Sequence, residues 1–143
     1  MLSVIIPAFC EAETLETMSG TLNSILTDAN IDYEVLFVDD GSTDNTWEII
    51  SRLHGTDKRF KGVHFSRNFG KDPAIFAGLK RCRGDCAVVL DCDLQHPPEK
   101  IVDMYRLWEQ GYEVVEGIKN TRGSESRLHR AGAELFYRWM SKV

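Results

Sequence analysis

Two aspartates separated by one residue, Asp91 and Asp93, are the feature of this sequence that most directly suggests chemistry. They follow the apolar run Cys86–Leu90 and precede a segment that begins with Pro97. Side chains at i and i+2 of an extended segment point to the same side, so the two carboxylates can converge. Such oxygen ligands suit Mg²⁺ or Mn²⁺, which keep positions open for phosphates. A solvated loop that caps the next helix would have the same spacing, so the motif alone leaves both interpretations open.

Strands and helices are expected to alternate along the chain. Near-continuous apolar runs predict buried strands at residues 2–6, 33–38, 63–65, 86–90 and 114–115. Apolar residues at helical spacing predict helices between these strands and after the last one. Strands of this type, separated by helices, are typical of a mostly parallel sheet sandwiched by helices. The predicted fold class is therefore α/β.

Two of the predicted helices carry specific start signals. Asp44 or Asn45 is expected to cap the helix that follows the second strand. Asp72 and Pro73 are a suitable N-cap and first helical residue for the helix after the third strand. We expect this helix to bury three apolar side chains, Ile75, Phe76 and Leu79.

Charged residues gather at the predicted strand ends, where open α/β sheets bind their ligands. Three of these ends are acidic and two are basic; the segments are residues 7–11, 38–41, 66–71, 91–93 and 117–119. A metal-bound diphosphate would explain the mixture, because carboxylates hold the cation while Lys and Arg neutralise the phosphates. The sequence lacks G-x-G-x-x-G after the first strand and lacks G-x-x-x-x-G-K-[ST]. The sequence therefore lacks the main motif that would indicate a dinucleotide-dependent dehydrogenase and the one that would indicate a P-loop NTPase.

The composition is that of a soluble globular domain. The 143 residues are 43% hydrophobic and 27% charged. Four cysteines without C-x-x-C spacing lie mostly in or beside predicted strands, which favours reduced thiols over zinc ligands or disulfides. Neither a membrane-spanning apolar run nor a secretory signal is recognisable. These features predict a cytoplasmic protein.

The charge is distributed unevenly along the chain. The net charge is −5, with 11 basic and 20 acidic side chains in residues 1–118 but 6 basic and 2 acidic ones in residues 119–143. A basic tail on an acidic body suggests an anionic partner near the C-terminus. A solvated basic helix face would give the same composition, and both interpretations stay open.

Four sequence blocks carry a resemblance to a known family: Val4–Phe9, Val38–Asp44, Ser66–Lys71 and Leu90–Glu99. They resemble the inverting family 2 glycosyltransferases with the GT-A fold. Within that family they are most similar to polyprenyl-phosphate glycosyltransferases, such as bactoprenol glucosyltransferases and dolichol-phosphate mannose synthases. The blocks occur in the family order and cover about residues 2–118. The resemblance implies a GT-A-type, Rossmann-like sheet and a nucleotide-sugar site.

The resemblance implies roles for residues on the nucleoside side of that site. Pro7, Phe9 and Glu11 match the loop that packs on the base and ribose. Asp40 matches the carboxylate that accepts a hydrogen bond from the base, and Val38 is expected to line the same pocket. The preceding aspartate is expected to be a structural partner at the turn. For Phe9, a position in the core is the alternative.

On the phosphate side, Arg67, Lys71 and Lys119 match basic positions near the diphosphate. For Arg67, a surface ion pair is the alternative. Asp91 and Asp93 match the metal motif, with Gln95 as a third oxygen ligand, and Cys92 between them is expected among the nucleotide-sugar-binding residues. The implied cofactor is Mg²⁺ or Mn²⁺.

The implied reaction moves a sugar from a nucleotide sugar to a polyprenyl phosphate with inversion. A UDP-sugar is the favoured donor and GDP-mannose the second candidate. Residues 1–118 would form the donor-binding core, and residues 119–143 a linker and basic amphipathic helix at the start of an acceptor or membrane-proximal region. Residues 127–143 would contact the cytoplasmic face of the membrane, and no nucleic acid is expected as a partner.

Two departures from the family pattern limit the comparison. Cys10 stands where relatives usually have Asn, which weakens the match around Glu11. No residue of 1–143 matches the acceptor-side base, so we expect these residues alone to bind the donor without transferring sugar. An N-terminal portion of a longer enzyme and a naturally short homologue both stay open. So do a binding module without turnover, a transferase acting on a saccharide, and a purely structural α/β domain.

Overall fold

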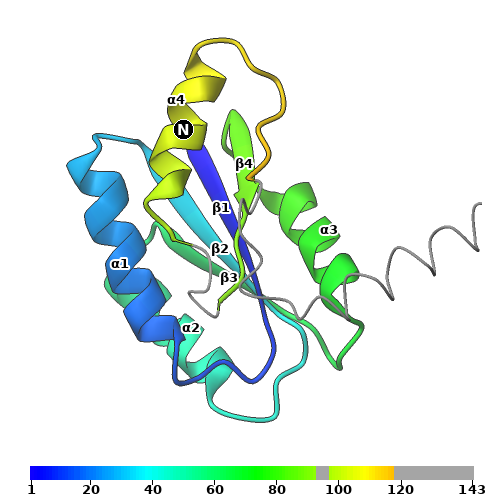
Figure 1. Cartoon of the computed structure of the whole chain (residues 1–143). Coiled ribbons are helices and arrows are strands. Elements are labelled where there is room, and N and C mark those ends of the chain that lie inside the picture. Colours follow the sequence, from blue (N-terminus) through cyan, green and yellow to red (C-terminus); the bar gives the residue numbers. More distant parts are fainter. Residues whose placement is uncertain (93–96, 118–143) are drawn as a thin grey trace, which may run out of the picture.

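A computed structural model describes residues 1–92 and 97–117 of the chain. Strands and helices alternate in it: β1 (Leu2–Ala8), α1 (Leu15–Asp28), β2 (Tyr33–Asp39), α2 (Thr46–Thr56), β3 (Phe60–His64), α3 (Lys71–Arg81), β4 (Cys86–Val89) and α4 (Lys100–Glu109). The strands form one parallel sheet in the order β3-β2-β1-β4 (Figure 1). The predicted α/β class with a parallel sheet is confirmed.

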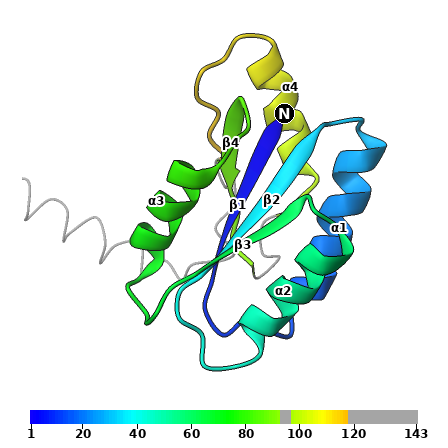
Figure 2. The ribbon, with the colours of Figure 1, turned by 180° about the vertical axis from the view of Figure 1, so that it is seen from behind.

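Helices cover both faces of this sheet, but unequally. Among the described helices, α1, α2 and α4 lie on one face and α3 lies on the other (Figures 1 and 2). The larger core lies under the three helices and joins β1 and β2 to buried side chains such as Leu15, Met18, Leu22, Ile50 and Ile101. The smaller core, under α3, contains Leu36, Val38 and Ala74. Within the part of the chain that the structure describes, the three helices therefore cover one sheet face more fully than α3 covers the other.

Helix α3 contacts the sheet through small residues. Ala74 and Gly78 are its buried positions, and a Cβ atom on Gly78 would lie 2.4 Å from Ile5 Cγ2. The prediction that Ile75, Phe76 and Leu79 are buried is wrong: Ile75 is half-buried, and Phe76 and Leu79 are exposed. Small residues let the helix backbone approach the sheet closely, so the larger apolar side chains lie to the side or outward.

Strand β1 is longer than predicted. It continues through Pro7 to Ala8, with Pro7 opposite Val38 of β2. The strand tolerates proline because β4 has already ended at Val89, opposite Ile5. Pro7 thus lies beyond the ladder between β1 and β4, where its missing N–H removes no bond of that ladder.

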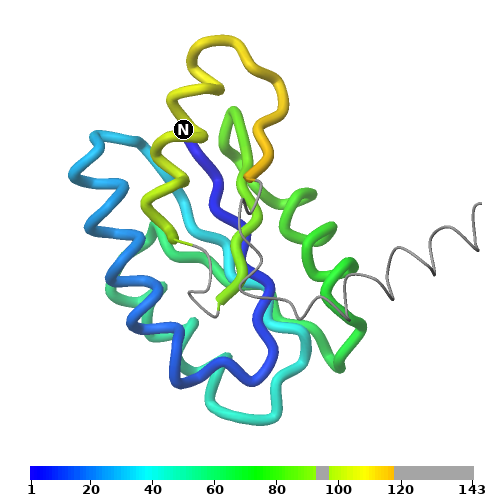
Figure 3. The backbone as a smooth tube through the Cα atoms, viewed as in Figure 1, coloured from blue at the N-terminus to red at the C-terminus, as the bar shows by residue number. Residues whose placement is uncertain are grey.

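The predicted fifth strand at residues 114–115 is wrong. Residues 112–117 are described and form no strand, and Val114 is 86% exposed. The tube in Figure 3 shows this segment returning from α4 toward β4. It lines a cavity of about 390 Å³ together with β4 instead of pairing with it. A short apolar run forms a strand only where a partner strand accepts its hydrogen bonds.

The start of α3 differs from prediction by two residues, whereas the predicted start of α2 at Asp44 or Asn45 is confirmed. Helix α3 begins at Lys71, with Gly70 as its N-cap residue, so Pro73 is the third helical residue and still lies in the tolerated first turn. Helix α2 begins after Asn45, but the side chain that bonds its first turn belongs to Asp44. The tail helix predicted for residues 127–143 lies outside the described residues. None of the described helices is long and apolar enough to cross a membrane.

A buried carboxylate, Glu34, connects three elements on the α3 side of the sheet. It accepts hydrogen bonds from Ser3 Oγ at 2.6 Å, Lys61 Nζ at 2.5 Å and the backbone N–H of Arg83 at 2.5 Å. Burial opposes ionisation of Glu34, but these donors outweigh it and lower the pKa of the carboxyl below its ordinary value. The ionised side chain therefore stabilises the fold.

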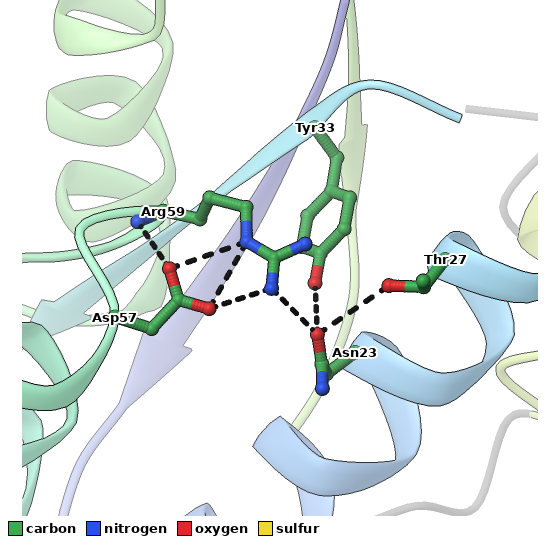
Figure 4. Close-up of polar contacts among 5 residues, drawn as sticks. All are labelled: Asn23, Thr27, Tyr33, Asp57 and Arg59. Carbon is green, nitrogen blue, oxygen red and sulfur yellow. Dashed lines mark hydrogen bonds and ion pairs between the residues drawn. The ribbon is translucent and has the colours of Figure 1, made fainter. Parts of the chain in front are cut away.

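A second polar cluster fastens α1 to the starts of β2 and β3 (Figure 4). Asn23 Oδ1 accepts hydrogen bonds from Tyr33 Oη and Arg59 Nη2, each at 2.8 Å. The Arg59 guanidinium also pairs with Asp57 and lies 4.7 Å from the centre of the Tyr33 ring. Hydrogen bonding from Arg59 lowers the pKa of Asp57. This cluster lies at the amino ends of the strands and has a structural role.

We predict that Gly78→Ala lowers the free energy of unfolding by about 1–3 kcal/mol, because the new methyl group would overlap the Ile5 side chain. Gly20→Ala in α1 is the matched control, since a Cβ atom there meets nothing within 4 Å. Alanine is the better helix former by roughly 0.5–1 kcal/mol, so the control should gain stability. Urea unfolding measures both changes, and equal gains for the two variants would contradict the packing of α3.

We predict that Glu34→Gln destabilises the fold at neutral pH and that the loss shrinks in acid. The folded pKa lies below the unfolded value of about 4.3, so the ionised group stabilises above that value. This contribution disappears as the pH falls through the folded pKa. Urea midpoints measured from neutral to acidic pH test it, with exposed Glu13→Gln as control. A difference between wild type and Glu34→Gln that stays constant with pH would contradict the assignment.

Candidate functional site

A pocket of about 380 Å³ opens at the carboxyl ends of β1, β2 and β4. It brings together seven of the predicted site residues: Pro7, Phe9, Glu11, Asp40, Lys71, Asp91 and Cys92. Ala8, Asn68, Gly70 and Ala74 complete the lining. The pocket thus combines acidic, basic and aromatic side chains from four loops that are distant in sequence.

The turn after β2 is held by a fully buried carboxylate, Asp39. Its Oδ1 accepts a hydrogen bond from Ser42 N at 2.9 Å, and its Oδ2 lies 2.8 Å from His64 Nδ1. Within this turn Gly41 has φ +69°, and a Cβ atom there would lie 2.4 Å from the carbonyl carbon of Arg67. The turn therefore rests directly on the loop between β3 and α3, and only glycine fits there. This geometry agrees with the structural role predicted for Asp39.

Asp40, the next residue, holds that same loop from the pocket side. Its two carboxylate oxygens accept hydrogen bonds from the backbone N–H groups of Phe69 at 2.7 Å and Gly70 at 2.8 Å. Asp40 is almost fully buried yet contributes to the pocket lining. An ionised carboxylate has about four acceptor positions, so two bonds leave capacity for a ligand. Asp40 thus positions the loop in addition to the ligand contact that the resemblance implies.

The loop after β1 is attached to the same turn. Cys10 N donates to Ser42 Oγ at 2.8 Å, and the Cys10 thiol lies 3.6 Å from Thr43 Oγ1. Cys10 has φ +56°, a left-handed conformation that Asn adopts more readily than Cys. Cys10, which stands where relatives usually have Asn, therefore occupies a strained backbone position beside the pocket.

Glu11 and Ala12 extend this attachment to the start of α2. Glu11 N donates to Thr46 Oγ1 at 2.9 Å, and Ala12 N donates to Asp44 Oδ2 at 3.3 Å. Partial desolvation opposes ionisation of Asp44, but hydrogen bonds from Thr46 and from backbone amides outweigh it and lower the pKa. The first turn of α2 and the β1 loop thus form one hydrogen-bonded unit.

An ion pair lies at the pocket edge. Lys71 Nζ, in the first turn of α3, is 2.6 Å from Asp91 Oδ1, just beyond β4. The two side chains are 57% and 35% exposed, so the pair is screened and adds little to stability. The pair matters for function because it places a cation and a carboxylate side by side in one pocket.

Asp91 fits a divalent-cation site in its chemistry and position. It presents a hard oxygen ligand in the pocket, and its present partner, an ammonium group, is a cation that a metal ion can replace. The other two predicted ligands, Asp93 and Gln95, lie outside the described residues. Within residues 1–92 and 97–117, no group of three or more His, Cys, Asp and Glu side chains could hold a metal. The metal site therefore stays a prediction.

The predicted site residues differ in how they are placed relative to the pocket. Phe9 is 46% exposed in the pocket, which excludes the core alternative. Cys92 is buried in the pocket lining, with its sulfur 3.3 Å from Thr14 Oγ1. Val38 packs in the smaller core and is not among the lining residues. Arg67 places its guanidinium 4.9 Å from the centre of the Phe69 ring, outside the pocket lining.

Lys119 lies outside the described residues. Sequence reasoning missed several residues that form the pocket or hold its loops: Ser42, Thr46, Asn68, Gly70 and Ala74. Asn68 and Gly70 belong to the block Ser66–Lys71, so that block could have indicated them. The roles of Ser42 and Thr46 depend on backbone contacts across more than 30 residues, which no local pattern reveals.

Curated relatives cover almost the whole chain. The Bacillus subtilis (strain 168) protein named "Uncharacterized glycosyltransferase YkcC" is 38% identical over 139 residues, which are 97% of this chain and 43% of the relative. The Escherichia coli (strain K12) "Prophage bactoprenol glucosyl transferase homolog" is 35% identical over 142 residues, which are 99% of this chain and 46% of the relative. The chain thus spans less than half the length of these relatives.

Solved structures share the fold at low identity. Residues 1–349 of Staphylococcus aureus TarS match with a TM-score of 0.62 at 22% identity, over 87% of this chain and 38% of that one. The Pyrobaculum calidifontis mannosyltransferase PcManGT, in complex with GDP-Man and Mn²⁺, matches with a TM-score of 0.60 at 23% identity, over 73% and 31%. The predicted GT-A-type fold is therefore confirmed.

The model of the family "Glycosyl transferase family 2" matches residues 3–141. This match covers nearly the whole sequence and includes all four blocks on which the resemblance was based. Together with relatives more than 30% identical, it shows that the chain belongs to glycosyl transferase family 2.

Proposed function

We propose that this chain contains the donor-binding part of an inverting glycosyltransferase that moves a sugar from a nucleotide sugar to a polyprenyl phosphate. The observation that carries the proposal is the single pocket in which Asp40, Lys71 and Asp91 meet beside the exposed ring of Phe9. A nucleoside diphosphate needs these groups: a flat apolar surface for the base, a cation for phosphate, and a carboxylate for the metal. Residues 1–118 form the proposed donor-binding core.

The donor class is supported by structural neighbours. TarS has been solved in complex with UDP and with UDP-GlcNAc, and PcManGT with GDP-Man. All three ligands are nucleoside diphosphates or their sugars. We favour a UDP-sugar as the donor of this protein, with GDP-mannose as the second candidate. A polyprenyl phosphate as the acceptor is supported by relatives whose names contain bactoprenol glucosyl transferase. We propose that the reaction takes place at the cytoplasmic face of the membrane.

The proposed reaction is one in-line displacement. An acceptor phosphate oxygen attacks the sugar C1, and the bond from C1 to the diphosphate breaks on the opposite face. Lys71 stabilises charge on the departing diphosphate, with Lys119 as a further basic group. Asp91, Asp93 and Gln95 would hold Mg²⁺ or Mn²⁺, which neutralises diphosphate charge when bound. The acceptor is already anionic, so positioning matters more than a base.

We predict that Asp91→Asn abolishes the Mn²⁺-dependent part of UDP binding. Neutralising the carboxylate removes a metal ligand, and a loss of about tenfold or more in affinity is expected. Asp72→Asn, an exposed carboxylate of α3 outside the pocket lining, is the matched control. Calorimetric titration of UDP with and without Mn²⁺ measures the effect. Identical metal dependence in the wild type and Asp91→Asn would sink the metal assignment, and no binding of UDP or GDP by the wild type would sink the proposed function.

We predict a different pattern for Asp40→Ala. This change removes the acceptor for Phe69 N and Gly70 N, so the pocket loop loses two charge-assisted hydrogen bonds. Binding of uridine and UDP should weaken alike, by about 1–3 kcal/mol. Asp91→Asn should leave uridine binding intact. Titrations with uridine and guanosine measure the difference, and equal losses of nucleoside affinity in both variants would rule out this division of roles.

A further inference from the structure

The outward face of α3 and the loop before it combine exposed apolar side chains with basic ones. Phe69, Phe76 and Leu79 are 49%, 60% and 46% exposed. Val89 is also exposed, and it points to the same side of the sheet because Cys86 and Val88 pack into the core on the other side. We define the α3 face by three apolar and four basic residues: Phe69, Phe76, Leu79, Arg67, Lys80, Arg81 and Arg83. Lys71 is left out because it lines the pocket. An exposed group of large apolar side chains of this kind marks an interaction surface.

The α3 face is basic although the surrounding domain is acidic. Five of the 11 basic residues of 1–118 fall within residues 67–83: Arg67, Lys71, Lys80, Arg81 and Arg83. The same stretch contains one acidic residue, Asp72. The rest of residues 1–118 therefore contains 6 basic and 19 acidic side chains. Basic residues are therefore concentrated in α3 and the segments next to it, whereas acidic residues prevail in the rest of residues 1–118.

Cations and apolar rings lie in direct contact on this face. The Lys80 ammonium lies 4.7 Å from the centre of the Phe76 ring, and the Arg67 guanidinium lies 4.9 Å from that of Phe69. Long basic side chains that extend along exposed rings can place their charge among lipid phosphates while the rings enter the acyl boundary. This combination distinguishes a lipid-binding surface from a purely apolar protein-binding patch.

We propose that the α3 face docks onto an anionic lipid surface and so holds the mouth of the pocket at the membrane. The proposal rests on the proposed function in one respect, since a polyprenyl-phosphate acceptor lies in that membrane. Helix α3 starts at the pocket, because Lys71 and Ala74 line it. Docking through the outward side of α3 therefore places the donor site next to the lipid phosphates.

A second copy of the chain fits this face poorly. A twofold contact would place the same surface on both partners, so the four basic residues of this face would meet four others. Like charges pressed together in a desolvated contact oppose association. An anionic membrane instead supplies the opposite charge and an apolar layer together.

Vesicle flotation with the full chain tests the docking surface. The wild type should bind vesicles of phosphatidylcholine with phosphatidylglycerol, and added salt should weaken binding. Phe76→Ser should lower partitioning by about tenfold, as expected for losing one inserted aromatic side chain. Lys80→Glu should lower it by roughly fivefold or more. Binding of UDP with Mn²⁺ should be unchanged in both variants, because neither residue lines the pocket.

Two matched variants control for general effects of polarity and charge. Leu107→Ser changes an exposed leucine of α4 on the opposite sheet face, and Lys58→Glu reverses an exposed charge before β3; both should partition like the wild type. Equal partitioning of Phe76→Ser and Leu107→Ser would overturn the proposal, as would absence of binding to anionic vesicles at low salt. A dimer that Phe76→Ser dissociates, seen by sedimentation velocity, would assign the face to a second copy and also overturn it. Vesicle binding without nucleotide binding would reject the proposed function alone.

Discussion

The pocket depends on two adjacent carboxylates at the end of β2, Asp39 and Asp40. Both are almost completely buried, and a buried charge is costly unless hydrogen bonds compensate it. Successive side chains of a strand point to opposite faces, so one dipeptide reaches both sides of the sheet. Asp39 bonds Ser42 and His64, whereas Asp40 bonds the backbone of Phe69 and Gly70. Their hydrogen bonds thus fix the turn after β2 and the loop before α3 relative to each other.

The same turn also fixes the loop that follows β1. Ser42 and Thr46 accept hydrogen bonds from the backbone of Cys10 and Glu11. Three loops from three parallel strands are therefore joined by short polar contacts, and the protein itself provides the shape of the pocket. A site whose walls are held in this way requires little reorganisation when a charged ligand enters. Under the proposed function, the exposed ammonium group of Lys71 exchanges its contact with Asp91 for a contact with a phosphate of the donor.

Sequence patterns predicted the elements that local composition determines. The buried runs of β1 and β2 were recognisable because both faces of these central strands are covered, and the chemistry at the strand ends followed from the parallel order. Patterns failed where the outcome depends on distant partners. Val114 lacks a partner strand, Val38 faces the smaller core instead of the pocket, and the loop-holding role of Asp40 rests on contacts 29 and 30 residues away. None of these contacts leaves a local signal.

Helix α3 shows how packing can reverse the meaning of an apolar pattern. Its larger apolar residues have helical spacing and were expected to face the core, but the sheet surface at Ile5 and Val38 leaves room only for Ala74 and Gly78. Once these small residues determine the rotation of the helix, Phe76 must point outward. The start of the helix is fixed independently, because Asp40 binds Gly70 N. The position that brings Lys71 to the pocket therefore also exposes Phe76, and the donor site and the outward face follow from one placement of α3.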